Sequence, residues 1–221
     1  MSAKSVLTGL FLIIQAILYT LILAVPAAPL AVCCYLSIIA CFLFALLLRG
    51  AGTGLFLAGL ACTLVADFFL VVLDPRQQLW GMVFFLGAQL CYALALHRKK
   101  PIRWLLLLRF LLTTLAVFLS VVILGQSADA LAVISVCYYA NLILNIFAAF
   151  SRWKQNKLLP IGFILFLLCD TVIGLQVAAG GYLPISESSW LYRLIFSSFN
   201  LAWFFYLPSQ VLIVLSLRNQ K

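Results

Sequence analysis

Acidic side chains are scarce in this chain of 221 residues, and histidine is scarcer still. The sequence holds five Asp and Glu residues against fourteen Lys and Arg, a single histidine, and only 9% charged residues in total. Soluble domains carry roughly a quarter charged residues, so the polar surface here is too small to cover a water-soluble core. Two thirds of the chain (67%) is apolar instead. We therefore expect lipid to surround most of the protein.

These shortages exclude several kinds of site. The only histidine, His97, lies in a basic segment, so neither a histidine-based metal site nor a Ser-His-Asp triad can form within the apolar runs, and we predict no metal and no cofactor. The seven cysteines all lie in apolar runs without CxxC spacing, which indicates buried apolar side chains. The net charge of +9 does not indicate nucleic-acid binding, because the basic residues flank apolar runs and no binding module is recognisable.

Eight apolar runs approach the roughly 20 residues that a membrane-spanning helix requires. They cover residues 5–25, 29–49, 52–73, 79–97, 102–124, 128–150, 158–180 and 190–217. The first run is too long for a signal peptide, and Pro26 spoils the cleavage site, so we expect a retained span. Since the linkers are short, the sequence predicts one all-α domain over residues 1–221, a bundle of eight transmembrane helices.

The basic residues distribute unequally between the two sides of the predicted bundle. Arg76 and Arg193 fall on one side, and Arg109 lies inside the fifth run, near enough to its end to snorkel. The other side holds Lys4, Arg49, Arg98, Lys99, Lys100, Arg103, Arg152, Lys154, Lys157, Arg218 and Lys221. Basic loops remain in the cytoplasm, so we predict cytoplasmic N- and C-termini and a multi-pass protein of a bacterial plasma membrane.

Two carboxyl groups lie inside predicted spans. Asp67 is in the third span and Asp170 in the seventh, and each follows a glycine by eight residues, Gly59 or Gly162. An ionisable residue at such depth costs about 2.5–3.5 kcal/mol on insertion scales and is a functional-site hypothesis by default. We predict that both are catalytic.

The settings of the two aspartates indicate a parallel repeat of four plus four helices. The span after each aspartate carries a central glutamine, Gln89 or Gln210, eight residues before a basic group, His97 or Arg218. Parallel repeats are related by an axis along the membrane normal, which would bring the two aspartates together at one depth. Apolar helices also resemble one another by chance, so the alternative of no duplication stays open.

A pair of carboxyl groups in hydrocarbon suits the hydrolysis of an acid-labile lipid bond. One group can stay protonated and act as a general acid while its partner stays ionised and acts as a base. Alternatively, each aspartate is satisfied locally and only locks helices together. Other polar side chains inside the spans bind a lipid headgroup or join helices, and our candidates for substrate binding are Gln89, Tyr92, Asn141, Asn200 and Gln210.

Three segments resemble the YhhN family of membrane proteins, whose characterised members are lysoplasmalogenases. AGLACTLVADFFLVVL followed by LWGMVFFLGAQLCYALAL is similar to the family's first block, IGFILFLLCDTVIGL to its second, and FFYLPSQVLIVLSL to its last span. The resemblance implies hydrolysis of the vinyl-ether bond of lysoplasmalogens without a metal, releasing a fatty aldehyde and a glycerophospho-base. The family's paired aspartates correspond to Asp67 and Asp170, and membrane lipids would be the partners.

The chain departs from the family pattern at several positions. Ala66 and Cys169 replace the glycine and the serine that precede the two aspartates, Gln89 replaces a histidine although Tyr92 remains, and Pro29 lacks its preceding lysine. A glutamine cannot perform the acid–base work of a histidine. Three functions therefore remain open: a hydrolase acting on a lysoplasmalogen or another ether lipid, a proton-coupled carrier that uses the acids as a relay, and a catalytically inactive membrane protein.

Overall fold

The structure, a computed structural model, describes residues 3–25, 29–50, 52–99, 103–181 and 185–219. Pro26, Lys100 and Lys221, which enter the predictions above, lie outside the described residues. Seven helices are long and apolar enough to cross a membrane and match the first seven predicted spans, so the chain is a multi-pass membrane protein. They are α1 (Ala3–Ala24), α2 (Leu30–Leu47), α3 (Gly54–Asp67, continued by a π-helix at Phe68–Val72), α4 (Gln78–Lys99), α5 (Arg103–Leu124), α6 (Ala130–Phe150) and α7 (Leu158–Gly181).

The prediction of one continuous helix over residues 190–217 is wrong. This part of the chain forms α8 (Trp190–Ile195), a non-helical stretch, and then α9 (Leu201–Ser216), which has 16 residues. Polar side chains define the start of each helix: Ser189 Oγ accepts from Tyr192 N at 3.1 Å, and Asn200 Oδ1 accepts from Trp203 N at 3.3 Å. The bundle therefore has seven long apolar helices and a shorter one.

A proline in α9 leaves one backbone carbonyl without its helical donor, and a side chain of α1 replaces that donor. Pro208 has no N–H, so the carbonyl of Phe204, four residues earlier, has no helical donor. Tyr19 of α1 donates its hydroxyl to that carbonyl at 3.0 Å. In a hydrocarbon environment such a replacement matters because water cannot satisfy the free carbonyl. The contact docks α1 against the last helix of the chain.

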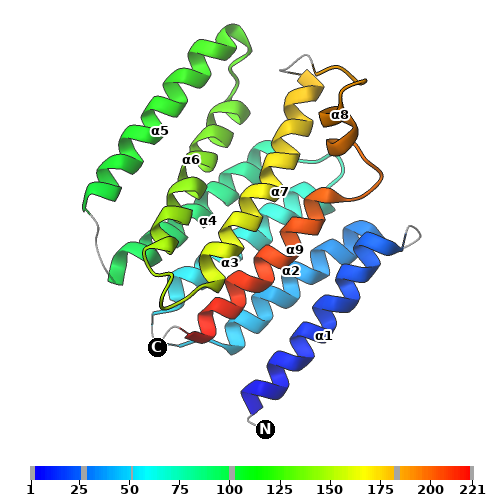
Figure 1. Ribbon diagram of the computed structural model, residues 1–221, viewed down its shortest axis with the longest axis vertical. Helices are drawn as coiled ribbons and strands as arrows, with labels where there is room; N and C mark the ends of the chain where they lie inside the picture. Colours follow the sequence, from blue (N-terminus) through cyan, green and yellow to red (C-terminus); the bar gives the residue numbers. More distant parts are fainter. Residues whose placement is uncertain (1–2, 26–28, 51, 100–102, 182–184, 220–221) are drawn as a thin grey trace.

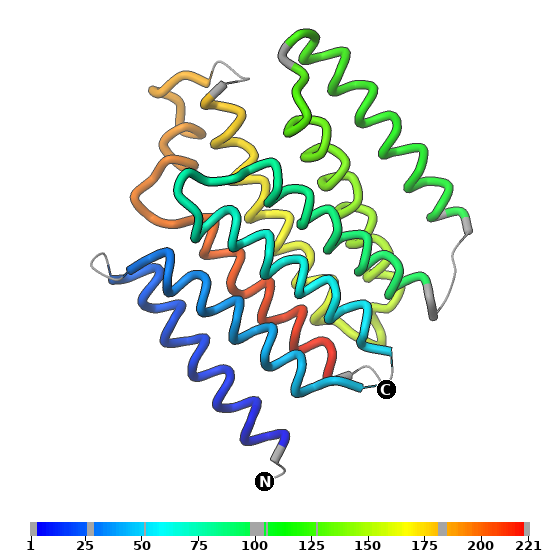
Figure 2. Tube along the Cα trace, turned by 180° about the vertical axis from the view of Figure 1, so that it is seen from behind, coloured from blue at the N-terminus to red at the C-terminus, as the bar shows by residue number. Residues whose placement is uncertain are grey.

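The helices are tilted alike and pair in the same way in the two halves of the chain. Figure 1 shows α5, α6, α7, α9, α2 and α1 side by side, and Figure 2, from behind, shows α3 and α4 in front of the middle of this row, with α1 and α5 uncovered at its edges. In the first half, α1 packs on α2, α2 on α3, and α3 on α4, while in the second half α5 packs on α6, α6 on α7, and α7 on α9. Three further contacts join the halves, α4 with α6, α9 with α2 and α1 with α9. A two-fold relation would exchange the first two, but the contact of α1 with α9 has no comparable counterpart between α5 and α4 among the described residues.

Two glycines allow equivalent close approaches. A Cβ added to Gly59 would overlap the ring of Tyr92, 2.8 Å from Cδ1, and one added to Gly162 would lie 2.9 Å from Cγ1 of Ile213. Tyr92 and Ile213 each follow a central glutamine, Gln89 or Gln210, by three residues. The tight α3–α4 and α7–α9 interfaces thus use corresponding positions, as small residues do in membrane helix packing.

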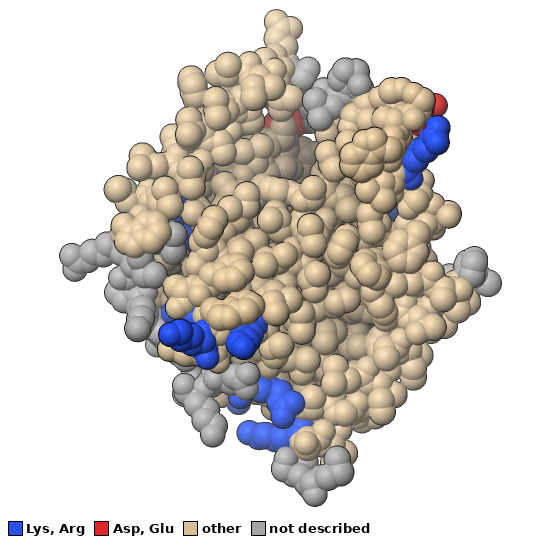
Figure 3. Space-filling model, in the orientation of Figure 1, with Lys and Arg blue, Asp and Glu red and all other residues tan. Residues whose placement is uncertain are grey.

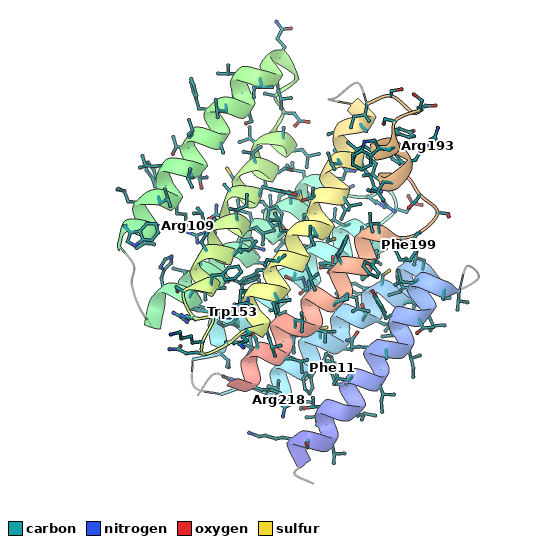
Figure 4. The ribbon with its side chains drawn as sticks, viewed as in Figure 1. Phe11, Arg109, Trp153, Arg193, Phe199 and Arg218 are labelled. Atoms are coloured by element: carbon teal, nitrogen blue, oxygen red, sulfur yellow. The ribbon has the colours of Figure 1, made fainter. Side chains whose placement is uncertain are left out.

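The charges of the bundle gather at one end. Figure 1 places both chain termini at the same end, and Figure 3 shows Lys and Arg side chains concentrated there. Arg218 lies at this end, whereas Arg193 lies at the opposite one (Figure 4). This arrangement has the asymmetry that the positive-inside rule describes, and the end that holds the termini is called the basic end below.

Candidate active site

Asp67 is the last residue of α3 and is sealed inside the bundle. Only 3% of its surface is exposed, and Tyr206 of α9 donates its hydroxyl to Oδ2 of Asp67 at 2.5 Å. The π-helix begins at the next residue, and its bond from Leu73 N to Phe68 O measures 3.1 Å. Single π-helical turns interrupt α-helices frequently at functional sites. The π-helix is therefore a second indication, besides the carboxyl group itself, that Asp67 lies at a functional site.

Asp170 lies near the middle of α7 and is half-buried. Tyr138 of α6, itself fully buried, donates its hydroxyl to Oδ2 of Asp170. One residue further along each helix, the hydroxyls of Tyr139 and Thr171 join at 2.6 Å and connect the same two helices. Each aspartate therefore receives a tyrosine hydroxyl from a neighbouring helix, but only Asp170 retains an open side.

The two tyrosine–aspartate pairs flank one aromatic cluster. Its four rings belong to Phe85, Tyr138, Phe166 and Tyr206, which we call the aromatic cluster. Phe166 has its ring centroid 5.5 Å from that of Tyr206 and 6.4 Å from that of Tyr138, and Phe85 lies 5.8 Å from Tyr138. Since both aspartates are bonded to rings of this cluster, they face the same interior and not opposite sides of the bundle.

The two aspartates lie in a largely apolar interior, which suits proton transfer between fixed groups. Two pockets of about 330 Å³ are described at the surface, and neither is lined by an aspartate. Among the described residues, no group of three or more His, Cys, Asp and Glu side chains could hold a metal ion.

A second polar group lies toward the basic end, between α4, α5 and α6. Arg109 of α5 donates from Nη1 to Asn141 Oδ1 at 2.5 Å and from Nη2 to Asn145 Oδ1 at 2.8 Å. Asn145 in turn donates from Nδ2 to the side-chain oxygen of Gln89 at 2.9 Å. Two of the predicted substrate-binding residues, Gln89 and Asn141, are thus brought together by an arginine. Arg109 points toward α6 and is held there, which corrects the expectation that it snorkels.

The other predicted substrate-binding residues lie apart from this group. Tyr92 is fully buried, with its ring centroid 5.4 Å from that of Phe163, and Gln210 is also fully buried, 3.4 Å from the Ser209 hydroxyl. Asn200 caps α9 and lines one of the surface pockets near the end of the bundle opposite the basic end. The structure therefore brings only two of the five candidates, Gln89 and Asn141, into one group.

Sequence reasoning missed the partners of the two aspartates. Tyr138, Asn141 and Asn145 occupy positions i, i+3 and i+7, so they share one face of α6. That spacing was available as a signal of a continuous polar stripe. No pattern in the sequence pairs Tyr206 with Asp67, because 139 residues separate them.

Comparison with known proteins agrees with the resemblance noted in the sequence. The model of the YhhN family matches residues 31–217, which include both aspartates, both tyrosine partners and the Arg109 group. No curated protein and no solved structure matches the chain. The matched region covers α2 through α9, far more than half of the chain, and the protein therefore belongs to the YhhN family.

Proposed function

We propose that this protein hydrolyses the vinyl-ether bond of a lysoplasmalogen-type lipid, using Asp67 and Asp170. The YhhN family includes lysoplasmalogenases, which supplies the reaction class. The observation that carries the proposal for this chain is the pair of membrane-embedded aspartates, each bonded to a tyrosine of the shared aromatic cluster. Carboxyl groups placed so deep in an apolar protein are expensive and serve chemistry by default.

The reaction needs one proton donor and one proton acceptor. The donor carboxyl adds its proton to the outer carbon of the vinyl ether, which leaves an oxocarbenium ion on the carbon bonded to oxygen. Water attacks that carbon, and the second carboxylate takes the water proton. The resulting hemiacetal then collapses: the second carboxyl returns its proton to the leaving glycerol oxygen, the C–O bond breaks, and the first carboxylate takes the proton of the hemiacetal hydroxyl. A fatty aldehyde and a glycerophospho-base leave, both carboxyl groups regain their starting protonation states, and no oxidant or reductant is needed.

The different exposure of the two aspartates supports a division of roles. Asp170 is half-buried and borders the membrane, so it is the carboxyl that an incoming lipid meets first. Asp67 has 3% of its surface exposed and lies behind the aromatic cluster. We assign proton donation to Asp170 and the handling of water to Asp67. Entry of the lipid chain then moves rings of the aromatic cluster aside, since neither described pocket reaches the aspartates.

The departures from the family pattern fall beside the aspartates without removing them. Cys169 is buried next to Asp170, and Ala66 is fully buried next to Asp67. Gln89 bonds to Asn145 on the Arg109 side and has no contact with either carboxyl group among the hydrogen bonds described. The proposal therefore assigns no proton transfer to this position.

A proton-coupled carrier would also use buried carboxyl groups. Such a protein needs a polar path that continues through the membrane, whereas here the apolar rings of Phe85 and Phe166 each pack against both tyrosines that hold the aspartates. The distinction is measurable in proteoliposomes. A carrier moves its substrate in response to a pH gradient, while a hydrolase releases aldehyde without a gradient.

The experiment compares single carboxylate replacements in the purified protein. Asp67→Asn and Asp170→Asn each remove an ionisable group with little change in volume, and we expect aldehyde release from lysoplasmalogen to fall by about a hundredfold or more. Asp129→Asn is the matched control, because asparagine caps a helix as well as the aspartate that now caps α6. Aldehyde release at the wild-type rate from either Asp67→Asn or Asp170→Asn contradicts the catalytic assignment.

A further inference from the structure

The guanidinium of Arg109 is charged, lies within the helical bundle, and has neutral partners. Within the described part of the chain its acceptors are the carboxamide oxygens of Asn141 and Asn145 and the backbone oxygen of Asn141, not a carboxylate. Its Nε is buried and has no partner among the described residues. A charge held in an apolar bundle without a counter-ion is costly, and such residues mark substrate or ion sites.

Further positive charge surrounds this group on the basic end. His97 of α4 is 8% exposed, its Nε2 has no partner among the described residues, and the charges of both Arg109 and Arg152 act on it. Arg152 is tied down separately by donating to the backbone oxygen of Leu96. Two fixed guanidinium groups and an unpartnered buried imidazole nitrogen therefore converge where α4, α5 and α6 meet. This combination selects an anion, and guanidinium groups match the oxygens of a phosphate particularly well.

The residues that hold Arg109 and Asp170 lie close together along α6, as a phosphate and an ether bond in one molecule require. Asn141 follows Tyr138 by three residues on the same face of α6, which places it about 4.5 Å further along the helix axis toward the basic end. Tyr138 holds Asp170. In a lysophospholipid, the phosphate and the ether oxygen at the other end of the glycerol are separated by three carbons and an ester oxygen, a span close to one helical turn.

The two charged groups are partly exposed on the side where such a lipid would approach. Asp170 and Arg109 are both half-buried, whereas Asp67 is sealed. α5 packs on α6 and leaves large apolar side chains such as Leu107 and Phe110 exposed. Figure 4 shows Arg109 on the part of α5 nearer the basic end. A single-chain lipid from the leaflet at the basic end could lie along α5 and α6 with its headgroup at Arg109.

We propose that Arg109, held by Asn141 and Asn145 and assisted by His97, binds the phosphate of the lipid substrate and so sets the position of the vinyl-ether bond at Asp170. This inference rests on the proposed function and deepens it, because it selects phosphorylated lipids over neutral glycerol ethers. Arg109 is a binding and specificity residue in this scheme, and it takes no proton.

The test uses two substrates with the same vinyl ether, a 1-alkenyl lysophosphatidylethanolamine and the corresponding 1-alkenylglycerol, which lacks the phosphate. For Arg109→Gln we expect kcat/KM on the phospholipid to fall roughly ten- to hundredfold, mainly through KM, with the rate on the alkenylglycerol unchanged. Arg109→Lys should retain part of the preference. Arg193→Gln, which alters a cation at the opposite end, should leave both rates at the wild-type level. Equal loss on both substrates would show a structural role for Arg109 and overturn the proposal.

A binding measurement decides the question even if the protein cleaves neither substrate. The probes are a saturated 1-alkyl lysophospholipid, the matching alkylglycerol and inorganic phosphate, and the readout is the unfolding midpoint of the purified full-length protein in detergent. We expect the alkyl lysophospholipid to raise the midpoint of wild type but not of Arg109→Gln. An equal rise with inorganic phosphate alone would identify a free-anion site and overturn the assignment to lipid. Failure of the wild type to release aldehyde would refute the proposed function and leave this binding result standing.

Discussion

The two halves of the molecule build the same contact with different side chains. In the first half, Gln15 of α1 donates to the backbone oxygen of Ser37 at 2.9 Å and to the sulfur of Cys41 at 3.4 Å, four residues apart on α2. In the second half, Arg109 of α5 donates to Asn141 and Asn145, four residues apart on α6. Corresponding helices thus meet through one polar side chain in each half.

These two contacts differ in the charge and in the solvent exposure of the polar side chain. Gln15 is 4% exposed and neutral, whereas Arg109 is half-buried and charged. The aspartates follow the same division, since Asp67 of the first half is sealed and Asp170 of the second half is not. The first half therefore seals these polar groups inside the bundle, whereas the second half leaves its charged groups partly exposed.

Exchanging the two polar side chains should give the largest effect. Gln15→Arg places a guanidinium where the described acceptors are one backbone oxygen and a thiol, so we expect it to destabilise the protein by about 3 kcal/mol or more. Arg109→Gln should cost about 1 kcal/mol or less, because glutamine can still reach an asparagine. Denaturation in mixed micelles measures both. If Ser37→Asn and Cys41→Asn are added to Gln15→Arg and recover no stability, the correspondence between the halves is wrong.

Alanine substitutions at Gly59 and Gly162 distinguish crowding by a side chain from crowding by the backbone. The three atoms nearest to a Cβ at Gly59 all belong to the ring of Tyr92, while those nearest to a Cβ at Gly162 belong to Ile213 and to the backbone oxygen of Ser209, at 3.1 Å. Each substitution should cost about 1–3 kcal/mol by overpacking. Tyr92→Ile should restore stability to Gly59→Ala, whereas Ile213→Ala should leave most of the loss in Gly162→Ala. Double-mutant cycles on the unfolding free energy check this, and equal rescue in both halves would contradict it.

Removing one hydroxyl from each tyrosine should give the smallest change in stability and the clearest change in activity. Tyr206→Phe leaves the sealed Asp67 without its described donor, and we expect a loss of about 1–2 kcal/mol in unfolding free energy. Tyr138→Phe should cost less, because the half-buried Asp170 can find another donor, yet it should slow aldehyde release by roughly tenfold as the carboxyl loses its fixed orientation. A larger stability loss for Tyr138→Phe than for Tyr206→Phe would reverse the comparison.

The sequence alone determined most of the architecture. Long apolar runs and their basic flanks fixed the seven long helices to within a few residues, because each helix in a membrane must satisfy its own backbone and bury no charge. The glycine and aspartate spacing in the third and seventh runs predicted a repeat of two halves, which stays a prediction: most helix pairings have a counterpart in the other half, whereas that of α1 with α9 does not. The last run was misjudged because α8 ends at Ile195 and Asn200 caps a new helix inside the run, a choice between local and helical hydrogen bonds that hydropathy does not record.

Only the tertiary structure decided which polar groups meet. The spacing along α6 places Asn141 and Asn145 on one face of the helix. That Arg109 bonds to them, and that Tyr206 bonds to Asp67, depends on how separate helices pack. These pairings are set by the side chains at close approaches such as Gly59 and Gly162, and no local pattern encodes them. The two aspartates were therefore visible in the sequence, whereas their shared aromatic cluster and the charged group beside it were not.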